Sequence, residues 1–287
     1  MATTYRGTIG VTTHEPMVDD DAPIDDIELV ADRADFLDLL TDRRLPKRDV
    51  VAELGHSRST VNRALGELVD AGLVDETPTG CRTTLVGRLA LDEYRRYVRH
   101  STDILDASDA LALLPEDCDV PAEAIAGGTT HLPSGNRPYE PYRQAEQFIE
   151  GSDAFRAAVR TFSHPSALKS ARTIAQGGSA VEIVFSRTVF DRLYADYREL
   201  VETLAGLDTF SGYVTEVTDC YSVLLSDRNQ PDGATDTSVL LATYAEDNDL
   251  KGVVVNDEPA AIRWAEEWYG RYRDVATPMS TATPDDE

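Results

Sequence analysis

The chain has 287 residues, with 52 acidic and 27 basic side chains and a formal net charge of −25. That length accommodates one large domain or two ordinary ones. No apolar run approaches the roughly 18 residues of a membrane-spanning helix, so no membrane segment is expected. Only three basic residues are lysine, and an acidic, lysine-poor composition is typical of proteins that work in concentrated salt, which screens self-repulsion. We therefore expect a halophilic cytoplasmic protein, with an ordinary acidic cytosolic protein as the alternative.

Both ends of the chain lack hydrophobic periodicity. Residues 1–25 and 279–287 cluster Thr, Asp and Pro, and we expect them to be disordered acidic tails. From Asp26 apolar residues recur at helical spacing, which predicts a first helix to about Arg44. A second helix is expected to start at Pro46, because proline suits the first helical turn.

The next turns and helix complete a recognisable order of elements. Gly55 is expected to end the second helix in a left-handed conformation, and Ser57 to cap a third helix over residues 58–70. A proline, a threonine and a glycine at 78–80 predict the turn of a small hairpin. Three helices and a hairpin predict a winged helix-turn-helix DNA-binding domain over residues 26–88.

The remainder of the chain mixes helical and strand patterns. A helix is expected from Gly87 to about Leu114, with a break near Ser101, and we assign residues 89–114 as a linker or dimerisation helix. Residues 115–278 predict a mixed α/β domain for effector sensing or dimerisation, so the fold class is α+β. The expected helices cover residues 142–149, 152–160, 166–176, 187–204 and 258–273, and the expected strands cover 181–185, 212–217, 221–225, 239–244 and 252–255.

The third helix has two unlike faces at 100° per residue. Val61, Ala64, Leu65, Leu68 and Val69 share one arc, which is expected to face the core. Ser59, Asn62, Arg63 and Gly66 fall on the opposite arc, and Arg58 lies at the helix start. In a helix-turn-helix, the start of the second helix of the pair reaches base edges in the major groove.

The residue types on this outer arc suit DNA. Arginine bonds guanine bidentately, asparagine bonds adenine, and hydroxyls reach phosphates. Residues 43–99 hold 11 basic and 8 acidic residues in an otherwise acidic chain, and no acidic residue occurs from 54 to 66. The predicted DNA-binding residues are Lys47, Ser57, Arg58, Ser59, Thr60, Asn62, Arg63, Arg82 and Thr83. A winged-helix module that docks to a protein and does not bind DNA is the alternative.

No catalytic or metal-binding constellation is evident in the sequence. The histidines lack ligand spacing, and neither a nucleophile elbow nor a P-loop occurs. The residues around His164 invite comparison with the His-x-Lys signature of phospholipase D-like folds, but the spacing differs and no suitable aspartate follows. We therefore expect no enzyme activity, no cofactor and no metal. Cys81, Cys118 and Cys220 show no paired spacing and are expected to be free thiols, with Cys81 as a weak candidate redox sensor.

Two stretches resemble known regulators. The stretch LPKRDVVAELGHSRSTVNRALGELVDAGLVDET resembles the winged-helix regulators of halophilic archaea. The later pattern, from PYEPYRQAEQFIEG to GVVVNDEPAAIRWAEEWYGRYRDVA, is similar to the middle domain of methanogenesis regulatory proteins. The resemblance covers about residues 26–276 and implies a sequence-specific transcription regulator, whose partner is double-stranded DNA.

The second half of the chain is expected to respond to an effector. A small-molecule pocket needs convergent polar and aromatic groups over an apolar wall, and such groups occur at the ends of the predicted elements. The candidate effector-binding residues are Tyr139, Tyr142, Arg143, Ser186, Arg187, Tyr221 and Asp227, with packing tyrosines as the alternative. The helix after the hairpin is expected to pair with its twin in a homodimer, which would set the half-site spacing.

Overall fold

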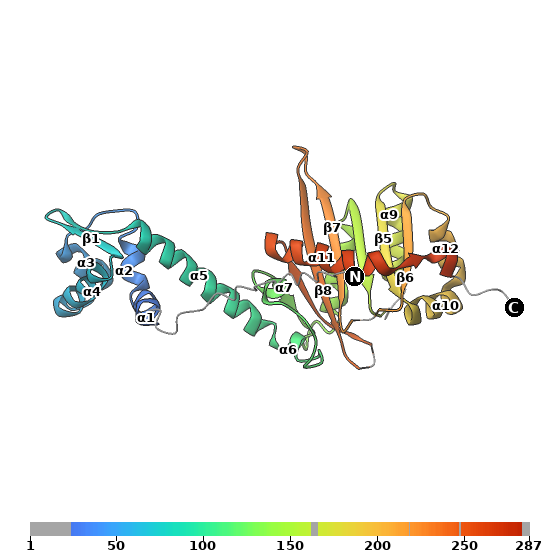
Figure 1. The fold of residues 1–287 in the computed structure, drawn as a ribbon, viewed down its shortest axis with the longest axis horizontal. Coiled ribbons are helices and arrows are strands. Elements are labelled where there is room, and N and C mark those ends of the chain that lie inside the picture. The colour runs from blue at the N-terminus through green and yellow to red at the C-terminus, as the bar shows by residue number, and fades with distance from the viewer. Residues whose placement is uncertain (1–23, 162–165, 218, 247, 283–287) are drawn as a thin grey trace, which may run out of the picture. The chain divides into compact units, whose positions relative to one another are not determined.

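A computed structural model describes residues 24–161, 166–217, 219–246 and 248–282 (Figure 1). The chain forms two compact units, Met1–Arg96 and Tyr97–Glu287, which divide within one helix. The architecture is mixed α and β, as the fold class predicts. In the described part of the chain, no helix is both long and apolar enough to cross a membrane.

The N-terminal unit contains short helices and one hairpin. Its elements are α1 (Ile24–Asp32), α2 (Ala34–Leu39), α3 (Lys47–Leu54), α4 (Arg58–Asp70), β1 (Val74–Thr77), β2 (Gly80–Thr83) and the start of α5 (Leu85–Asp106). The prediction of one continuous first helix is wrong, because non-helical backbone at Arg33 divides it. Phe36, Leu37, Leu65 and Leu68 belong to a buried core that joins α2 to α4.

The predicted ends of α3 and α4 are confirmed. Pro46 precedes α3, and Gly55 ends it with a φ of 70°. The Ser57 hydroxyl accepts a hydrogen bond from the amide of Thr60, as an N-cap should. After the hairpin, α5 begins at Leu85 and continues past Ser101 to Asp106, so the break expected near Ser101 is wrong.

The C-terminal unit is built on one eight-stranded sheet of order β10-β6-β5-β4-β7-β8-β9-β3. Its strands are β3 (Thr129–His131), β4 (Ala154–Val159), β5 (Ala180–Ser186), β6 (Phe210–Thr215), β7 (Ser222–Asn229), β8 (Thr235–Tyr244), β9 (Leu250–Asn256) and β10 (Thr277–Pro278). The three strands β4, β5 and β6 are parallel, and the other pairings are antiparallel.

Helices cover both faces of this sheet (Figure 1). On one face lie α8 (Glu140–Glu150), α9 (Ser166–Gln176) and α10 (Arg187–Ala205), and on the other lie α6 (Ser108–Leu111), α7 (Ala122–Ile125) and α11 (Pro259–Val275). A hydrophobic core lies on each face of the sheet. Successive residues of a strand point to opposite faces, so Ala157 packs in one core and Ala158 in the other. Burial on both faces follows from the pleat of a central strand.

Three predictions are wrong in this unit. The sequence predicts a helix over residues 152–160, but Ala154–Val159 form β4, which pairs with both β5 and β7. The expected tail at 279–287 begins with a short helix, α12 (Met279–Ala282), and Met279 is buried against the sheet core. Of the three cysteines, Cys118 and Cys220 form a disulfide rather than staying free, while Cys81 is a free, buried thiol on β2.

Candidate nucleic-acid interface

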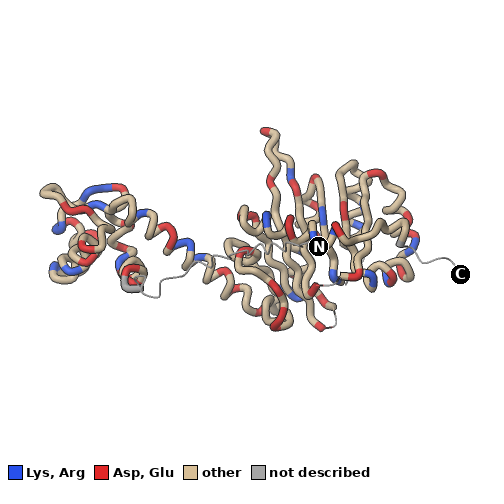
Figure 2. The backbone as a smooth tube through the Cα atoms, in the orientation of Figure 1, with Lys and Arg blue, Asp and Glu red and all other residues tan. Residues whose placement is uncertain are grey.

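The outer face of α4 is exposed, and its inner face is buried, as the 100° periodicity predicts. Val61, Ala64, Leu65 and Leu68 are buried. The exposed residues of the first two turns are Arg58, Ser59, Thr60, Asn62 and Arg63. No acidic side chain occurs in the first turn, so the N-terminus of the helix offers its amides and a local positive field (Figure 2).

The two arginines of this face differ in their partners. No carboxylate among the described residues forms an ion pair with Arg58. Arg63 donates to Glu67 one turn later at 2.8 Å, and Arg33 donates to the same carboxylate at 2.9 Å. These hydrogen bonds, with that from Arg63 the larger cause, hold the pKa of Glu67 below its ordinary range. Because the Arg63 side chain is 78% exposed, this pair is weak and Arg63 can exchange Glu67 for another anion.

The loop between α3 and α4 is held against α2. The ring of His56 stacks on Phe36 with centroids 5.6 Å apart, and its Nε2 lies 3.3 Å from the Asp35 carboxylate. Left-handed Gly55 turns the chain at this point. The turn that leads into α4 is therefore fixed by the two contacts of His56 with α2.

The hairpin is tied to the segment that precedes α3. The Leu45 amide donates to Cys81 O at 2.9 Å, and the Cys81 amide donates to Leu45 O at 2.8 Å. Gly80 makes this approach possible, since a Cβ at its position would lie 2.5 Å from the carbonyl carbon and oxygen of Leu45. Arg44 also holds the hairpin in place: it donates a hydrogen bond to Gly80 O at 2.9 Å and forms an ion pair with Asp75 at 2.8 Å.

The remaining predicted DNA-binding residues differ in how exposed their side chains are and in the partners they have. Arg82 is exposed on β2. Lys47 is half-buried and pairs with Glu76 at 2.8 Å, so it must leave that partner to reach a phosphate. Thr83 is only 5% exposed and donates to Leu37 O, so its prediction as a DNA contact is wrong: the hydroxyl faces the core.

The predicted effector-binding residues do not converge on one pocket. Tyr142 lines a cavity of about 90 Å³ between α8 and the sheet. Ser186 and Tyr221 lie at a different, very small cavity, at the carboxyl ends of β4, β5 and β6. Asp227 lies at a third one, where Arg156 reaches it at 3.7 Å.

Three of these candidates are exposed or form ion pairs on the surface. Tyr139 is 74% exposed. Arg143 pairs with Glu140 on the same helix, and Arg187 pairs with Glu216 at 3.0 Å. The single-pocket expectation is therefore wrong, because Tyr142 and Tyr221 belong to the cores on opposite faces of the sheet. The cavity at Tyr142 has mainly apolar walls and several hydroxyls.

Sequence reasoning missed a cluster of side chains around Asp219. Trp268 donates to Asp219 Oδ2 at 3.3 Å, and Tyr272 donates to the same oxygen at 2.8 Å. The disulfide of Cys118 and Cys220 lies beside them. Burial is the main cause that raises the pKa of Tyr272, with the hydrogen bond to Asp219 second. No local spacing reveals this cluster, because Cys118 lies 102 residues before Cys220.

Comparison with known proteins gives two family matches. Residues 138–275 match the middle domain of the methanogenesis regulatory protein FilR1, and residues 22–103 match the HVO_A0261 N-terminal domain. No curated protein matches the chain. The C-terminal half of the chain is therefore similar to a domain of a regulatory protein, and the chain is regulator-like in that respect.

Several solved structures match the chain at low identity and low TM-score. TrmBL2, described as an archaeal chromatin protein with a novel mode of DNA binding, has a TM-score of 0.40 at 12% identity and covers 88% of this chain and 98% of its own. NucT from Helicobacter pylori has a TM-score of 0.42 at 11% identity, covering 53% of this chain and 98% of its own. The phospholipase D family member Nuc from Salmonella typhimurium has a TM-score of 0.37 at 12% identity, covering 53% and 97%.

Proposed function

We propose that the chain is a sequence-specific DNA-binding transcription regulator with a winged helix-turn-helix reading head. In this proposal α4 enters the major groove of DNA, and the hairpin of β1 and β2 contacts the sugar-phosphate backbone. The observation that carries it is the exposed, acid-free start of α4, where Arg58, Asn62 and Arg63 lie opposite the buried apolar face. The match of residues 138–275 to a regulatory protein supports the same role.

Concentrated salt shapes how such a protein would bind. Release of counterions drives much protein–DNA affinity and weakens steeply as salt rises. A chain of net charge −25 also repels DNA over most of its surface. We therefore expect base contacts by Arg58 and Arg63, rather than many phosphate contacts, to supply most of the specific affinity.

The effector belongs to the cavity beneath α8 in this proposal. Its walls are mainly apolar, with Leu224, Leu240 and Leu250 among them. In this cavity the Tyr244 hydroxyl donates a hydrogen bond to Ser222 Oγ at 3.0 Å. Polar groups on an apolar wall favour a small, largely apolar molecule with one hydrogen-bonding group.

Self-association through α5 completes the proposal. This helix exposes Leu89, Tyr97 and Leu105, at 58%, 69% and 70% of their surface. In this proposal these side chains become buried when α5 pairs with its twin. Light scattering in concentrated salt checks it, and a monomeric mass both with and without DNA contradicts the homodimer.

The proposal assigns no chemical reaction to the chain. Among the described histidines, His56 lies before α4, His100 on α5 and His131 on β3, and no cluster of metal ligands contains any of them. His164, which prompted the comparison with phospholipase D-like enzymes, lies outside the described residues. A hydrolase assay on the purified chain tests this part of the proposal.

The test of DNA reading is genome-wide immunoprecipitation with an Arg58→Ala/Arg63→Ala double variant. Each bidentate arginine–guanine contact is worth about 1–3 kcal/mol, so each single variant should lose about fivefold to 150-fold in specific affinity. Arg192→Ala is the matched control, because Arg192 is also exposed and pairs with an acid four residues later, on α10. Peaks that the double variant retains would refute the reading face, and absent peaks with co-purified protein would favour the docking alternative.

A further inference from the structure

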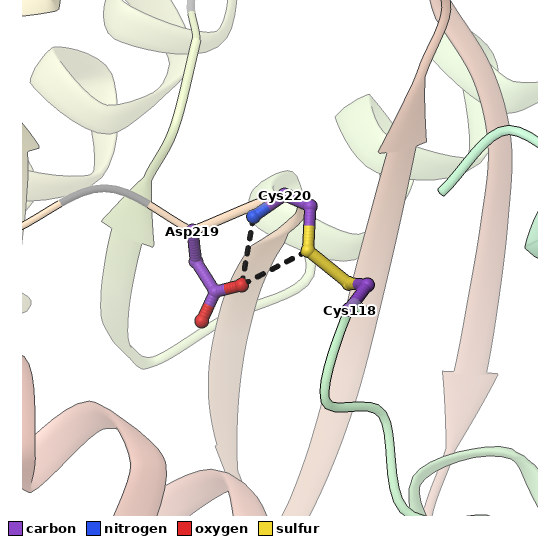
Figure 3. Close-up of side chains that lie close together, drawn as sticks. All are labelled: Cys118, Asp219 and Cys220. Atoms are coloured by element: carbon purple, nitrogen blue, oxygen red, sulfur yellow. Dashed lines mark hydrogen bonds between the residues drawn. A yellow bond between two sulfur atoms is a disulfide. The ribbon is translucent and has the colours of Figure 1, made fainter. Parts of the chain in front are cut away.

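Two cysteines and a carboxylate meet beside the start of β7, a central strand of the C-terminal sheet (Figure 3). Cys118 lies in the connection between α6 and α7, and Asp219 and Cys220 immediately precede β7. Their sulfur and oxygen ligand atoms all lie within 4.8 Å of one another. All three side chains are half-buried, so small solutes can reach them.

The Asp219 carboxylate is oriented by α11. Its Oδ2 accepts hydrogen bonds from Trp268 and Tyr272. Its Oδ1 accepts from the Cys220 amide at 2.7 Å and lies 3.2 Å from Cys220 Sγ. Oδ2 is therefore held by two side-chain donors, while Oδ1 accepts the Cys220 amide and also faces the sulfur atoms, as in a metal site whose carboxylate is oriented from behind.

We propose that reduction of the Cys118–Cys220 disulfide creates a zinc site from the two thiolates and Asp219 Oδ1. Thiolates select zinc over magnesium and calcium, and zinc accepts sulfur and carboxylate oxygen together in tetrahedral geometry. Three protein ligands leave a fourth position for water. The adjoining cavity of about 200 Å³, lined by Asp219, Tyr221, Trp268 and Tyr272 among others, has room for that water.

The disulfide and the zinc site exclude each other, because they use the same two sulfur atoms. Two molecules of a small thiol reduce the protein disulfide to two thiols and leave as their own disulfide. Zinc then replaces the two thiol protons, and the sulfurs stay at the same oxidation level. A small-molecule disulfide reverses this by oxidising both thiolates to the protein disulfide and releasing zinc and two thiolates.

This inference stands apart from the DNA-reading proposal, because its readout does not involve DNA. Cobalt(II) is the probe for zinc, since cobalt bound to thiolates gives a charge-transfer absorption that carboxylates alone do not give. This distinction is needed in a chain with 52 acidic residues. The full chain is reduced with a phosphine, desalted and titrated with cobalt, and zinc is then added to displace it.

We expect one cobalt per reduced chain, with the thiolate charge-transfer band, and no band for the oxidised chain. Cys118→Ser and Cys220→Ser should abolish the band. Tyr272→Phe should weaken binding by roughly tenfold, as loss of a donor to a ligand does. Cys81→Ser is the matched control and should bind like the wild type, because Cys81 is buried in the other unit.

A second measurement needs no variant that must fold. Zinc should protect Cys118 and Cys220 of the reduced wild-type chain from alkylation, as read by peptide mass spectrometry. The proposal is overturned if the reduced chain gives no charge-transfer band, or if zinc leaves alkylation of both cysteines unchanged. A band that persists in both Cys118→Ser and Cys220→Ser would also overturn it.

Discussion

Gly80 is a position where one methyl group should strongly perturb the N-terminal unit. Its φ of +132° is one that L residues rarely adopt, and an added Cβ would lie 2.5 Å from Leu45 carbonyl atoms. A strained backbone of this kind costs about 1–3 kcal/mol. Relief of the clash would break the two Leu45–Cys81 backbone hydrogen bonds, each worth about 1 kcal/mol. Gly80→Ala should therefore destabilise the N-terminal unit by roughly 3–5 kcal/mol.

Hydrogen exchange of the full chain is the assay, because the Leu45 and Cys81 amides report directly on the contact. We expect both amides to lose protection, and specific DNA affinity to fall although no proposed contact residue has changed. Gly66→Ala is the control of opposite sign: Gly66 lies in the middle of α4 with nothing within 4 Å of its Cβ position. Alanine there should stabilise the helix by about 0.5–1 kcal/mol. Unchanged protection at Leu45 and Cys81 in Gly80→Ala would refute this reasoning.

Three further outcomes are expected. Glu67→Gln, which removes a negative charge from the back of the reading face, should tighten nonspecific DNA binding roughly twofold in a titration at fixed salt; weaker binding would contradict it. Reduction of Cys118–Cys220 opens a link with a sequence separation of 102 and should destabilise the C-terminal unit in guanidinium unfolding, by up to about 5 kcal/mol. Hydrogen bonds from neighbouring side chains, first that of Arg143, lower the pKa of Glu140 to about 2 from its ordinary 4.5. The stabilisation from Glu140 is therefore present above about pH 4.5 and lost as the pH falls towards 2, and Glu140→Gln should remove that part of the acid-unfolding profile.

The sequence predicts the elements that local chemistry determines. The cap at Ser57, the left-handed Gly55 and the apolar period of residues 58–70 need no distant contact, and the structure confirms all three. The buried and exposed faces of α4 follow from the same period. Most of the exposed face of α4 therefore follows from the order of residues along one helix, although DNA binding by that face stays a prediction.

The errors arise where distant residues decide. The stretch Ala154–Val159 contains three alanines and no aromatic alternation, so it suits a helix locally, but β5 and β7 on either side make it a strand. The sequence predicts a solvent-facing hydroxyl at Thr83, but in the fold this hydroxyl donates a hydrogen bond to the distant carbonyl of Leu37. The Cys118–Cys220 disulfide depends on two segments 102 residues apart in the sequence, a separation that no local motif encodes.

The ends of the large sheet limit how copies of the chain can join. Its two outermost strands, β3 and β10, have only three and two residues, and Pro278 in β10 has no amide hydrogen to donate. Short edge strands and proline are the devices by which sheets resist adding a strand from another molecule. The sheet is thereby protected against open-ended fibre growth, and any self-association is directed to helical surfaces, where it can stop at two copies.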